Sequence, residues 1–338
     1  MRKACPLCGN ADGIGTSPST LNLLMCARCS MVYSDVPDAS SLVESVHRDY
    51  FGDGYLRKRA FFTDWAHRWK ARRRLEVIRR HKPGGRLLDI GCGGGDLLVE
   101  ARAAGYEGVG LDDSITLVAH ARQRHGLEVH CGDPASFKPS APFEIVVMSH
   151  VLEHVVRPLQ MLESVRRVLV PGGILYVATP NIASWQARFA GWASYEPYHF
   201  VYFSPSTLTR ALEQAGFRVL DLHTWEPLSG WLNTALRGWF GVGYSRVRLA
   251  VQGDPRGIYR VRYLLVRAIL GVARVGSGVL LTPVRMFQES QLKGEELICL
   301  ATAFESPKVP GALGTGTESR EGASGEEPWR NPAPSDAR

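Results

Sequence analysis

Residues Leu87–Gly95 read LLDIGCGGG, and this stretch decides the fold of the chain. An apolar strand runs directly into Gly91, Gly93 and Gly95, and Asp96 then opens a helical pattern. Because glycine has no Cβ, such a turn can bend sharply and lets a bound molecule approach the backbone closely. The first turn of the helix adds backbone N–H donors that have no partner within the helix. The stretch therefore predicts a ligand-binding turn between a strand and a helix.

The spacing of the glycines separates two classes of cofactor. The dinucleotide fingerprint requires Gly-x-Gly-x-x-Gly, and its third glycine would fall here on Asp96. A carboxylate at that position would repel a pyrophosphate, which favours a ligand without phosphate. The stretch instead resembles motif I of class I S-adenosylmethionine (SAM) dependent methyltransferases, whose pattern is acidic-x-Gly-x-Gly-x-Gly. Its positions are filled here by Asp89, Gly91, Gly93 and Gly95.

Further stretches resemble the same family in the same order. Gly108–Asp112 (GVGLD) ends on an acid about 20 residues beyond the glycine turn, the distance at which a carboxylate can bind ribose hydroxyls. Val129–Asp133 (VHCGD) ends where the family places an acid beside the adenine amine. Phe143–His154 looks like the fourth strand with its loop, and Leu169–Thr179 like the fifth strand. The resemblance implies that SAM binds at Asp89, Gly91, Gly93, Gly95, Asp112, Asp133 and Ser149.

Each acid alone has a simpler explanation, because an acid that ends a strand often caps a helix or stabilises a turn. The ordered series favours SAM over the alternative of a nucleotide-binding or degenerate α/β domain of similar topology. Alternating strands and helices from about Gly84 to Trp225 predict an α/β fold with a parallel, doubly wound sheet. The resemblance specifies a Rossmann-like sheet of seven strands, with ligands at the carboxyl ends of the parallel ones.

Four cysteines near the N-terminus form the second informative pattern. Cys5-x-x-Cys8 and Cys26-x-x-Cys29 are separated by 17 residues, which lies in the range typical of zinc sites. Four thiolates at this spacing suit a tetrahedral structural zinc, which would stabilise a module too small for its own core. The alternative is four unligated thiols or a redox pair. Cys92, Cys131 and Cys299 occur singly and are predicted to be small buried hydrophobic residues.

These patterns divide the chain into four segments. We expect a zinc ribbon at residues 1–45 and a basic, aromatic helical lid or linker at 46–83. The methyltransferase domain is expected at 84–305, with a helical insertion at about 226–293. Residues 306–338 are rich in Gly, Ser, Pro and Glu and poor in apolar clusters, so we expect a disordered tail.

Charge and hydropathy restrict the cellular setting. The 338 residues carry a formal net charge of +7, and eleven basic residues outnumber two acidic ones between Arg57 and Lys82. Trp65 and Trp69 are four residues apart in this basic segment, so they share a helical face that we expect to pack on the core or to close over the cofactor. The chain has no leader-like apolar region at its start and no run of 18 apolar residues. These features predict a cytoplasmic protein.

One loop carries the residues expected to meet the acceptor. Glu196–Ser204 (EPYHFVYFS) resembles the His-Phe-x-Tyr-Phe-Ser run of zinc-ribbon sugar C-methyltransferases, in which a Glu-His pair works near the sugar. Here Tyr198 replaces that Glu. Met148–Val155 and Leu292–Ile298 look like methyltransferases of the ubiquinone-biosynthesis and polysaccharide-cluster type. The resemblance implies a hydroxyl acceptor on a sugar, a lipid or a quinone-like compound.

Methyl transfer from a sulfonium is an in-line displacement, so the enzyme mainly aligns donor and acceptor and removes the acceptor proton. A neutral imidazole near pH 7 suits that second task. We predict that His199 is the general base, against the alternative that it only bonds to loop backbone. His150 and His154 are rival candidates.

About 70 residues separate the last two predicted strands, Phe217–His223 and Glu296–Phe304, where a hairpin loop usually has about 2 to 5. This insertion is rich in Trp and Leu and carries arginines at Arg260, Arg267 and Arg274. A substrate lid, an interface with another subunit and docking on anionic lipid all remain possible roles.

Two other functions are compatible with the sequence. A ribosomal RNA methyltransferase could combine a zinc module with a SAM domain and contact phosphates through the basic segment. Enzymes that methylate base amines often carry Asn or Asp-Pro-Pro-aromatic after the fourth strand, whereas this chain has Ser149-His-Val-Leu. A non-catalytic docking protein is the third alternative, which the intact Asp89, Gly91, Gly93 and Asp112 disfavour.

Overall fold

A computed structural model describes residues 4–16, 21–35, 61–240, 272–273 and 275–304. Residues 1–304 form one compact unit. Three predictions lie outside the described residues: the disordered tail at 306–338, the helical arginines at 260, 267 and 274, and the part of the linker up to residue 60.

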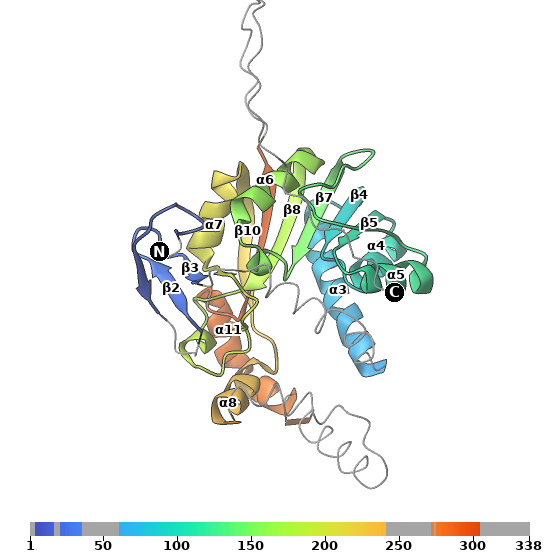
Figure 1. Cartoon of the computed structure of the whole chain (residues 1–338). Helices are drawn as coiled ribbons and strands as arrows, with labels where there is room; N and C mark the ends of the chain where they lie inside the picture. The colour runs from blue at the N-terminus through green and yellow to red at the C-terminus, as the bar shows by residue number, and fades with distance from the viewer. Residues whose placement is uncertain (1–3, 17–20, 36–60, 241–271, 274, 305–338) are drawn as a thin grey trace, which may run out of the picture. The chain divides into compact units, whose positions relative to one another are not determined.

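A seven-stranded sheet forms the centre of the compact unit (Figure 1), in the order β10-β11-β8-β7-β4-β5-β6. Five strands are parallel, and β11 runs antiparallel between β8 and β10. This order confirms the predicted Rossmann-like class I methyltransferase sheet. The strands are β4 (Arg86–Ile90), β5 (Glu107–Asp112), β6 (Glu128–Cys131), β7 (Phe143–Ser149), β8 (Leu169–Pro180), β10 (Phe217–Trp225) and β11 (Glu296–Ala303).

Helices cover both faces of the sheet, because successive residues of each central strand point to opposite sides. Leu87 belongs to the apolar cluster that includes α3 (Phe61–His81), α4 (Asp96–Ala103) and α5 (Ile115–His125). Leu88 belongs to the opposite cluster, which includes α6 (Pro158–Val168) and α7 (Pro205–Gln214). Ser204 caps α7 through a reciprocal bond pair with Thr207.

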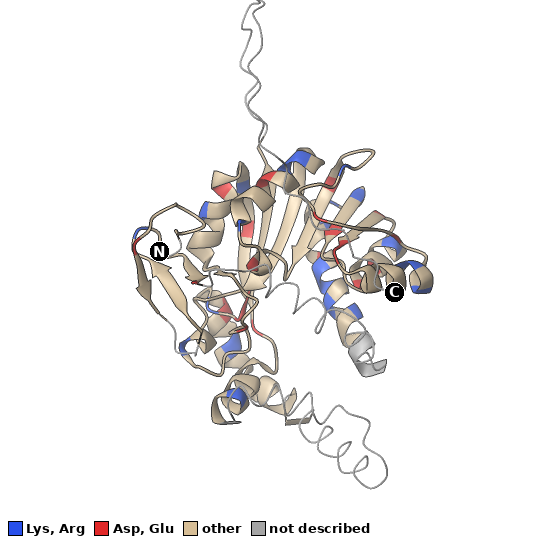
Figure 2. Ribbon diagram, viewed as in Figure 1, with Lys and Arg blue, Asp and Glu red and all other residues tan. Residues whose placement is uncertain are grey.

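The helix α3 buries a different face from the one expected. Leu75 and Ile78 pack into the core, whereas the side chain of Trp65 is 64% exposed, so the packing prediction is wrong for Trp65. Trp69 lies against Trp225 at the end of β10, with ring centroids 6.3 Å apart. Figure 2 shows the basic residues along α3; most of them are exposed, whereas Arg74 is half-buried.

The N-terminal module is a four-stranded antiparallel sheet that takes its last strand from a distant part of the chain. Its strands are β1 (Gly13–Gly15), β2 (Leu23–Cys26), β3 (Val32–Ser34) and β9 (Val201–Tyr202). The ribbon sheet is therefore completed by the loop that follows β8.

The insertion between β10 and β11 contains α8 (Gly230–Phe240) and α11 (Thr282–Ser290). A buried polar network holds α11 on the core: the Glu226 carboxylate accepts bonds from Gln186 (2.6 Å) and Gln288 (3.1 Å). Two short 3-10 helices, η1 (Leu152–His154) and η2 (Gln186–Arg188), follow β7 and β8. Within the described part of the chain, no helix combines the length and apolar character that crossing a bilayer requires.

Candidate active site

The glycine turn after β4 has the backbone shape that the sequence predicts. Gly91, Gly93 and Gly95 have φ angles of 70°, 55° and 84°, values that favour glycine. A Cβ on Gly91 would lie 2.5 Å from Val151, and one on Gly95 would lie 2.4 Å from Leu127. Nothing lies within 4 Å of the same position on Gly93. The turn is therefore packed at its two ends and open at its centre, where a ligand can approach the backbone.

Asp112, at the end of β5, is bonded directly to this turn. Its carboxylate accepts hydrogen bonds from the backbone N–H groups of Gly93 (2.8 Å) and Ser114 (2.9 Å). Each carboxylate oxygen has a second lone pair, so these bonds orient the group and leave it capacity to accept ribose hydroxyls.

Asp89 lies beneath the turn and is only 5% exposed. Burial raises the pKa of its carboxyl to about 7, although the positive charge of Arg74 opposes the shift. A cation placed beside Asp89 would lower the pKa of its carboxyl, because the cation favours the ionised form.

Two further predicted SAM contacts lie at neighbouring strand ends. Ser149 ends β7, and its buried hydroxyl has no hydrogen-bond partner among the described residues. Asp133 follows β6 and accepts a bond from the N–H of Ala135 (2.9 Å). A cavity of about 440 Å³ borders Asp133 but extends along β5 and β6 toward Arg86 and Glu128, and the glycine turn does not line it.

The predicted cofactor residues therefore gather at the carboxyl ends of β4, β5, β6 and β7. The open centre of the turn, and the Ser149 hydroxyl that has no partner among the described residues, fit a ligand with polar groups such as SAM.

The same edge of the sheet carries an ion-pair cluster that the sequence did not reveal. The His150 ring contacts Glu153 through Nδ1 (3.0 Å) and Glu296 through Nε2 (2.9 Å). His150 has a φ of 56° and a side chain that is 45% exposed. Burial alone would lower its pKa, but the bonds and charges of the two carboxylates outweigh burial and raise the pKa to about 9. The cluster therefore holds His150 as an imidazolium at neutral pH.

The His-x-x-Glu spacing of His150 and Glu153 was the one local signal for this cluster. Glu296 could not be inferred, because it is 146 residues away in sequence. It reaches the site because β11 is antiparallel, which pairs its first residue with Pro180 at the end of β8.

His199 lies near this cluster but is only 8% exposed. Its Nδ1–H donates to the carbonyl of Ser194 (2.8 Å), and its ring packs against His154 with centroids 4.8 Å apart. Burial lowers the pKa of His199 to about 4. His199 is therefore neutral at pH 7, and its Nε2 is the nitrogen with the lone pair.

The loop around His199 is held by contacts with His154 of η1 and with Arg237 of α8. His154 contacts the carbonyl of Tyr198 through Nδ1 (3.1 Å), and the Tyr198 ring stacks on it. Glu196 pairs with Arg237 of α8 (3.1 Å). Ligand atoms of Glu153, His154 and His199 lie within 4.8 Å of one another, a donor set that a divalent cation could use. Glu153 also accepts a bond from Thr179 (3.1 Å).

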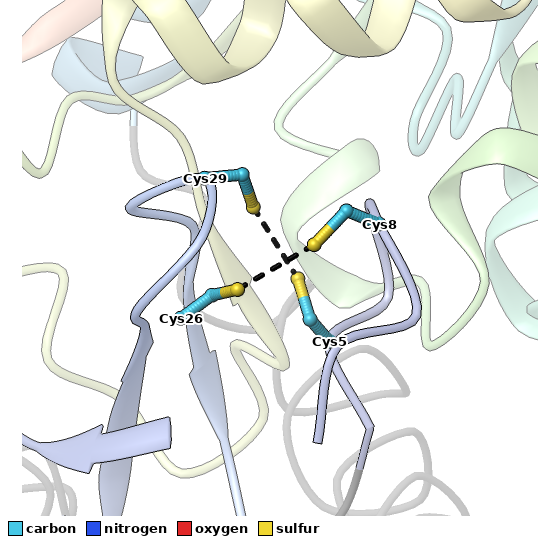
Figure 3. A group of neighbouring side chains, drawn as sticks. All are labelled: Cys5, Cys8, Cys26 and Cys29. Carbon is cyan, nitrogen blue, oxygen red and sulfur yellow. Dashed lines mark hydrogen bonds between the residues drawn. The ribbon is translucent and has the colours of Figure 1, made fainter. Parts of the chain in front are cut away.

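The four ribbon cysteines converge on one point (Figure 3), and all four ligand atoms lie within 4.8 Å of one another. The Sγ atoms of Cys5 and Cys29, and those of Cys8 and Cys26, are 3.5 Å apart. Zinc–sulfur bonds of about 2.3 Å in a tetrahedron place sulfurs about 3.8 Å apart, so the cluster is compatible with zinc.

The ribbon thiols differ in pKa, because burial raises the pKa of Cys5 and of Cys29. Burial disfavours the Cys26 thiolate, but bonds from the backbone of Cys29 and Arg28 outweigh burial and lower the pKa of Cys26 to about 6. Of the remaining cysteines, Cys92 and Cys299 are buried as predicted, whereas Cys131 is exposed, so that prediction is wrong. Cys131 is the last residue of the edge strand β6.

Comparison with known proteins agrees with this site. Residues 55–222 match a family described as "Methyltransferase domain". A probable S-adenosylmethionine-dependent methyltransferase from Mycolicibacterium smegmatis is 35% identical over 44% of this chain and 60% of its own length. A ubiquinone biosynthesis O-methyltransferase from Dinoroseobacter shibae is 33% identical over 41% of this chain and 62% of its own length. The chain thus spans about 60% of the length of these curated relatives.

Among solved structures, a SAM-dependent methyltransferase from Archaeoglobus fulgidus is 17% identical, with a TM-score of 0.46 over 70% of this chain and 94% of that one. The sheet order, the glycine turn and the family match agree with one another. The chain therefore carries, at residues 55–222, a methyltransferase domain of the SAM-dependent class.

Proposed function

We propose that this protein transfers the methyl group of SAM to a hydroxyl of a small-molecule acceptor: a sugar, a lipid-linked compound or a quinone-like compound. The observation that carries the proposal is one edge of the sheet on which a SAM-type glycine turn adjoins the histidines of the β7 loop. The O-methyltransferase relatives support a hydroxyl acceptor.

The residues of the turn have separate tasks in this reaction. SAM supplies an electrophilic methyl group on a sulfonium. The backbone of Gly91–Gly95 would hold SAM, and the carboxylate of Asp112 would accept hydrogen bonds from its ribose hydroxyls. Ser149 and Asp133 lie where they can contact the adenosine part. Alignment of donor and acceptor then supplies most of the lowering of the barrier.

The acceptor proton goes to His199 in this mechanism. At pH 7 the raised pKa of His150 keeps that ring protonated, whereas the lowered pKa of His199 leaves a neutral imidazole that can accept a proton. A base with so low a pKa is weak, so alignment of donor and acceptor must supply most of the lowering of the barrier. His150, clamped by Glu153 and Glu296, can donate a bond to the acceptor when a hydroxyl displaces one carboxylate.

We also propose a structural zinc at Cys5, Cys8, Cys26 and Cys29. Four sulfur ligands complete a tetrahedron and leave no open position, so the metal would stabilise the ribbon and take no part in methyl transfer.

The first experiment uses the full-length protein and SAM with a radiolabelled methyl group. A lysate treated with both is separated into RNA, protein, lipid-soluble and small polar fractions, with heat-inactivated protein as control. Label in the lipid-soluble or small polar fraction is the expected result. Label confined to nuclease-sensitive material would contradict the proposal and establish the RNA alternative.

The structure offers the RNA alternative little support. Arg68 and Arg72 of α3 bond to Glu100 of α4 (2.6 and 2.7 Å), and Arg73 packs between Trp69 and Trp225. Basic residues engaged in this way are less available for phosphate contacts than the sequence alone indicates.

A further inference from the structure

The last strand of the ribbon is paired with the loop that carries His199. Val32 and Tyr33 of β3 lie opposite Tyr202 and Val201 of β9. The N–H of Ser34 donates to the carbonyl of Phe200 at 2.9 Å. His199 is the residue immediately before this paired segment, so the ribbon edge fixes the backbone that carries the proposed base.

The other side of the same segment is bonded to the methyltransferase core. The N–H of Phe200 donates to the carbonyl of Glu153 (2.8 Å), and the N–H of Ile182 donates to the carbonyl of Phe203 (2.9 Å). Residues 199–203 therefore lie between the ribbon and the β7 and β8 loops. Their position depends on both neighbours.

The cysteine cluster controls the strand that makes this contact. Cys26 ends β2, Cys29 lies in the following turn, and β3 begins at Val32. The N–H of Cys26 donates to the carbonyl of Met31 across the turn (2.9 Å). Strands of three or four residues carry few ladder bonds, so a hairpin this short depends on its metal to keep its shape.

We propose that the four-cysteine ribbon is a positioning element of the acceptor site: its metal-held β2–β3 hairpin fixes β9 and thereby holds His199 against His154 and Glu153. This inference rests on the proposed role of His199 and assigns the ribbon a task beyond stability. The glycine turn belongs to β4 and is not paired with β9, so we expect SAM binding to change little when this link is broken.

The test compares two variants of the full-length protein that break the same link at different points. Cys26→Ser removes a metal ligand. Ser34→Pro keeps all four cysteines and removes the one N–H that donates to Phe200, because proline has no amide hydrogen. Asp35→Pro is the matched control, because the N–H of Asp35 donates instead to Asn22, on the β2 side. Cys131→Ser controls for loss of a thiol outside the ribbon.

Three measurements need no acceptor: bound zinc, hydrogen exchange of the peptide covering 199–203, and SAM affinity. Ser34→Pro is expected to retain zinc, to raise exchange at 199–203 by about tenfold or more, and to bind SAM within about twofold of the parent. Cys26→Ser is expected to lose zinc and show the same local increase. Both controls should match the parent in exchange at 199–203.

A histidine titration by NMR separates positioning from general loosening. Release of the loop exposes His199, so its pKa should rise from about 4 toward the ordinary value of about 6.5. Unchanged exchange and an unchanged His199 pKa in a Cys26→Ser protein that has lost zinc would overturn the proposal. A loss of SAM affinity as large as the loss of exchange protection at residues 199–203 would also overturn the proposal. The ribbon would then stabilise the whole unit without a specific task. If turnover is absent in every protein while these shifts occur, the proposed function fails and the positioning link stands.

Discussion

At the scale of single residues, Asp89 couples SAM binding to pH. Burial raises the pKa of Asp89 to about 7, and SAM brings positive charge to the turn above it, which favours the carboxylate. SAM affinity should therefore fall as the pH drops below 7, by up to about tenfold per pH unit. Calorimetry at pH 6, 7 and 8 measures this slope. Asp89→Asn should bind SAM more weakly at pH 8 and lose the slope, whereas Asp221→Asn, on the edge strand β10, should keep it. A slope that persists in Asp89→Asn would assign the proton to another group.

The pH dependence of turnover at saturating SAM should distinguish His199 from His150 as the general base. If His199 accepts the proton, its lowered pKa of about 4 keeps it ready at every pH tested, and kcat should be flat from pH 6 to 8. If His150 accepts the proton, kcat should instead rise toward its pKa of about 9. His199→Ala should lower kcat by about 100-fold or more with SAM affinity unchanged. Glu296→Gln, which removes one carboxylate from His150, should leave the flat profile in place. Full turnover by His199→Ala, or a profile that moves with Glu296→Gln, would transfer the base role to His150.

At the scale of elements, the glycine turn can be tested against a second glycine of the same backbone shape. Alanine at Gly91 (φ 70°) or at Gly172 (φ 71°) introduces a similar backbone strain of about 1 to 2 kcal/mol. Only at Gly91 does the new Cβ meet Val151, at 2.5 Å, which adds about 1 to 3 kcal/mol of overpacking. Gly91→Ala should therefore unfold at lower denaturant and lose SAM binding, while Gly172→Ala loses stability alone. Denaturant melts and SAM titrations of both proteins check this, and equal effects would remove the packing argument.

The junction between the insertion and the sheet should become less stable as the pH rises from about 5 to 8. Burial, helped by the charge of Glu295, raises the pKa of Glu226 to about 8, whereas an unfolded chain has an ordinary Glu pKa of about 4.3. The folded protein then binds a proton that the unfolded chain has released, so stability falls as the pH rises from about 5 to 8. Glu226→Gln should flatten that part of the stability profile, and Glu213→Gln, an exposed change on α7, should not. An unchanged profile in Glu226→Gln would mean that Glu226 stays ionised.

Local features of the fold could be predicted from the sequence, whereas contacts between residues far apart in the chain could not. The glycine turn could be predicted because its cause lies within a few residues, whereas the sheet order followed from the resemblance of the ordered motifs to class I methyltransferases. Trp65 could not be placed, because helical spacing identifies a shared face but not which face the sheet will cover. The contact of His150 with Glu296 spans 146 residues, and β9 is a two-residue strand with no pattern of its own. Such contacts exist only once the sheet has been assembled.

At the scale of the whole molecule, the ribbon and the methyltransferase fold share one core. Met31 and Tyr33 of the ribbon are fully buried in the same apolar cluster as Phe203, Leu208 and Leu212. Removal of residues 1–35 should therefore do more than delete a separate module, because it strips β9 of its partner and exposes the cluster around α7. Each 1 kcal/mol lost lowers the melting temperature by roughly 2 to 4 °C at this size, and loss of several buried side chains costs more than that.

Removal of residues 305–338 is the matched deletion, since those residues lie outside the unit formed by residues 1–304. Calorimetry compares the full-length protein with the two shortened ones. The melting temperature should decrease by at least about 5 °C for the N-terminal deletion and by no more than about 1 °C for the C-terminal one. An N-terminal deletion that melts like the parent and binds SAM normally would mean that the ribbon is an appended domain. In that event the burial of Met31 and Tyr33 would carry no energetic weight, and β9 would hold its place through its bonds to the β7 and β8 loops alone.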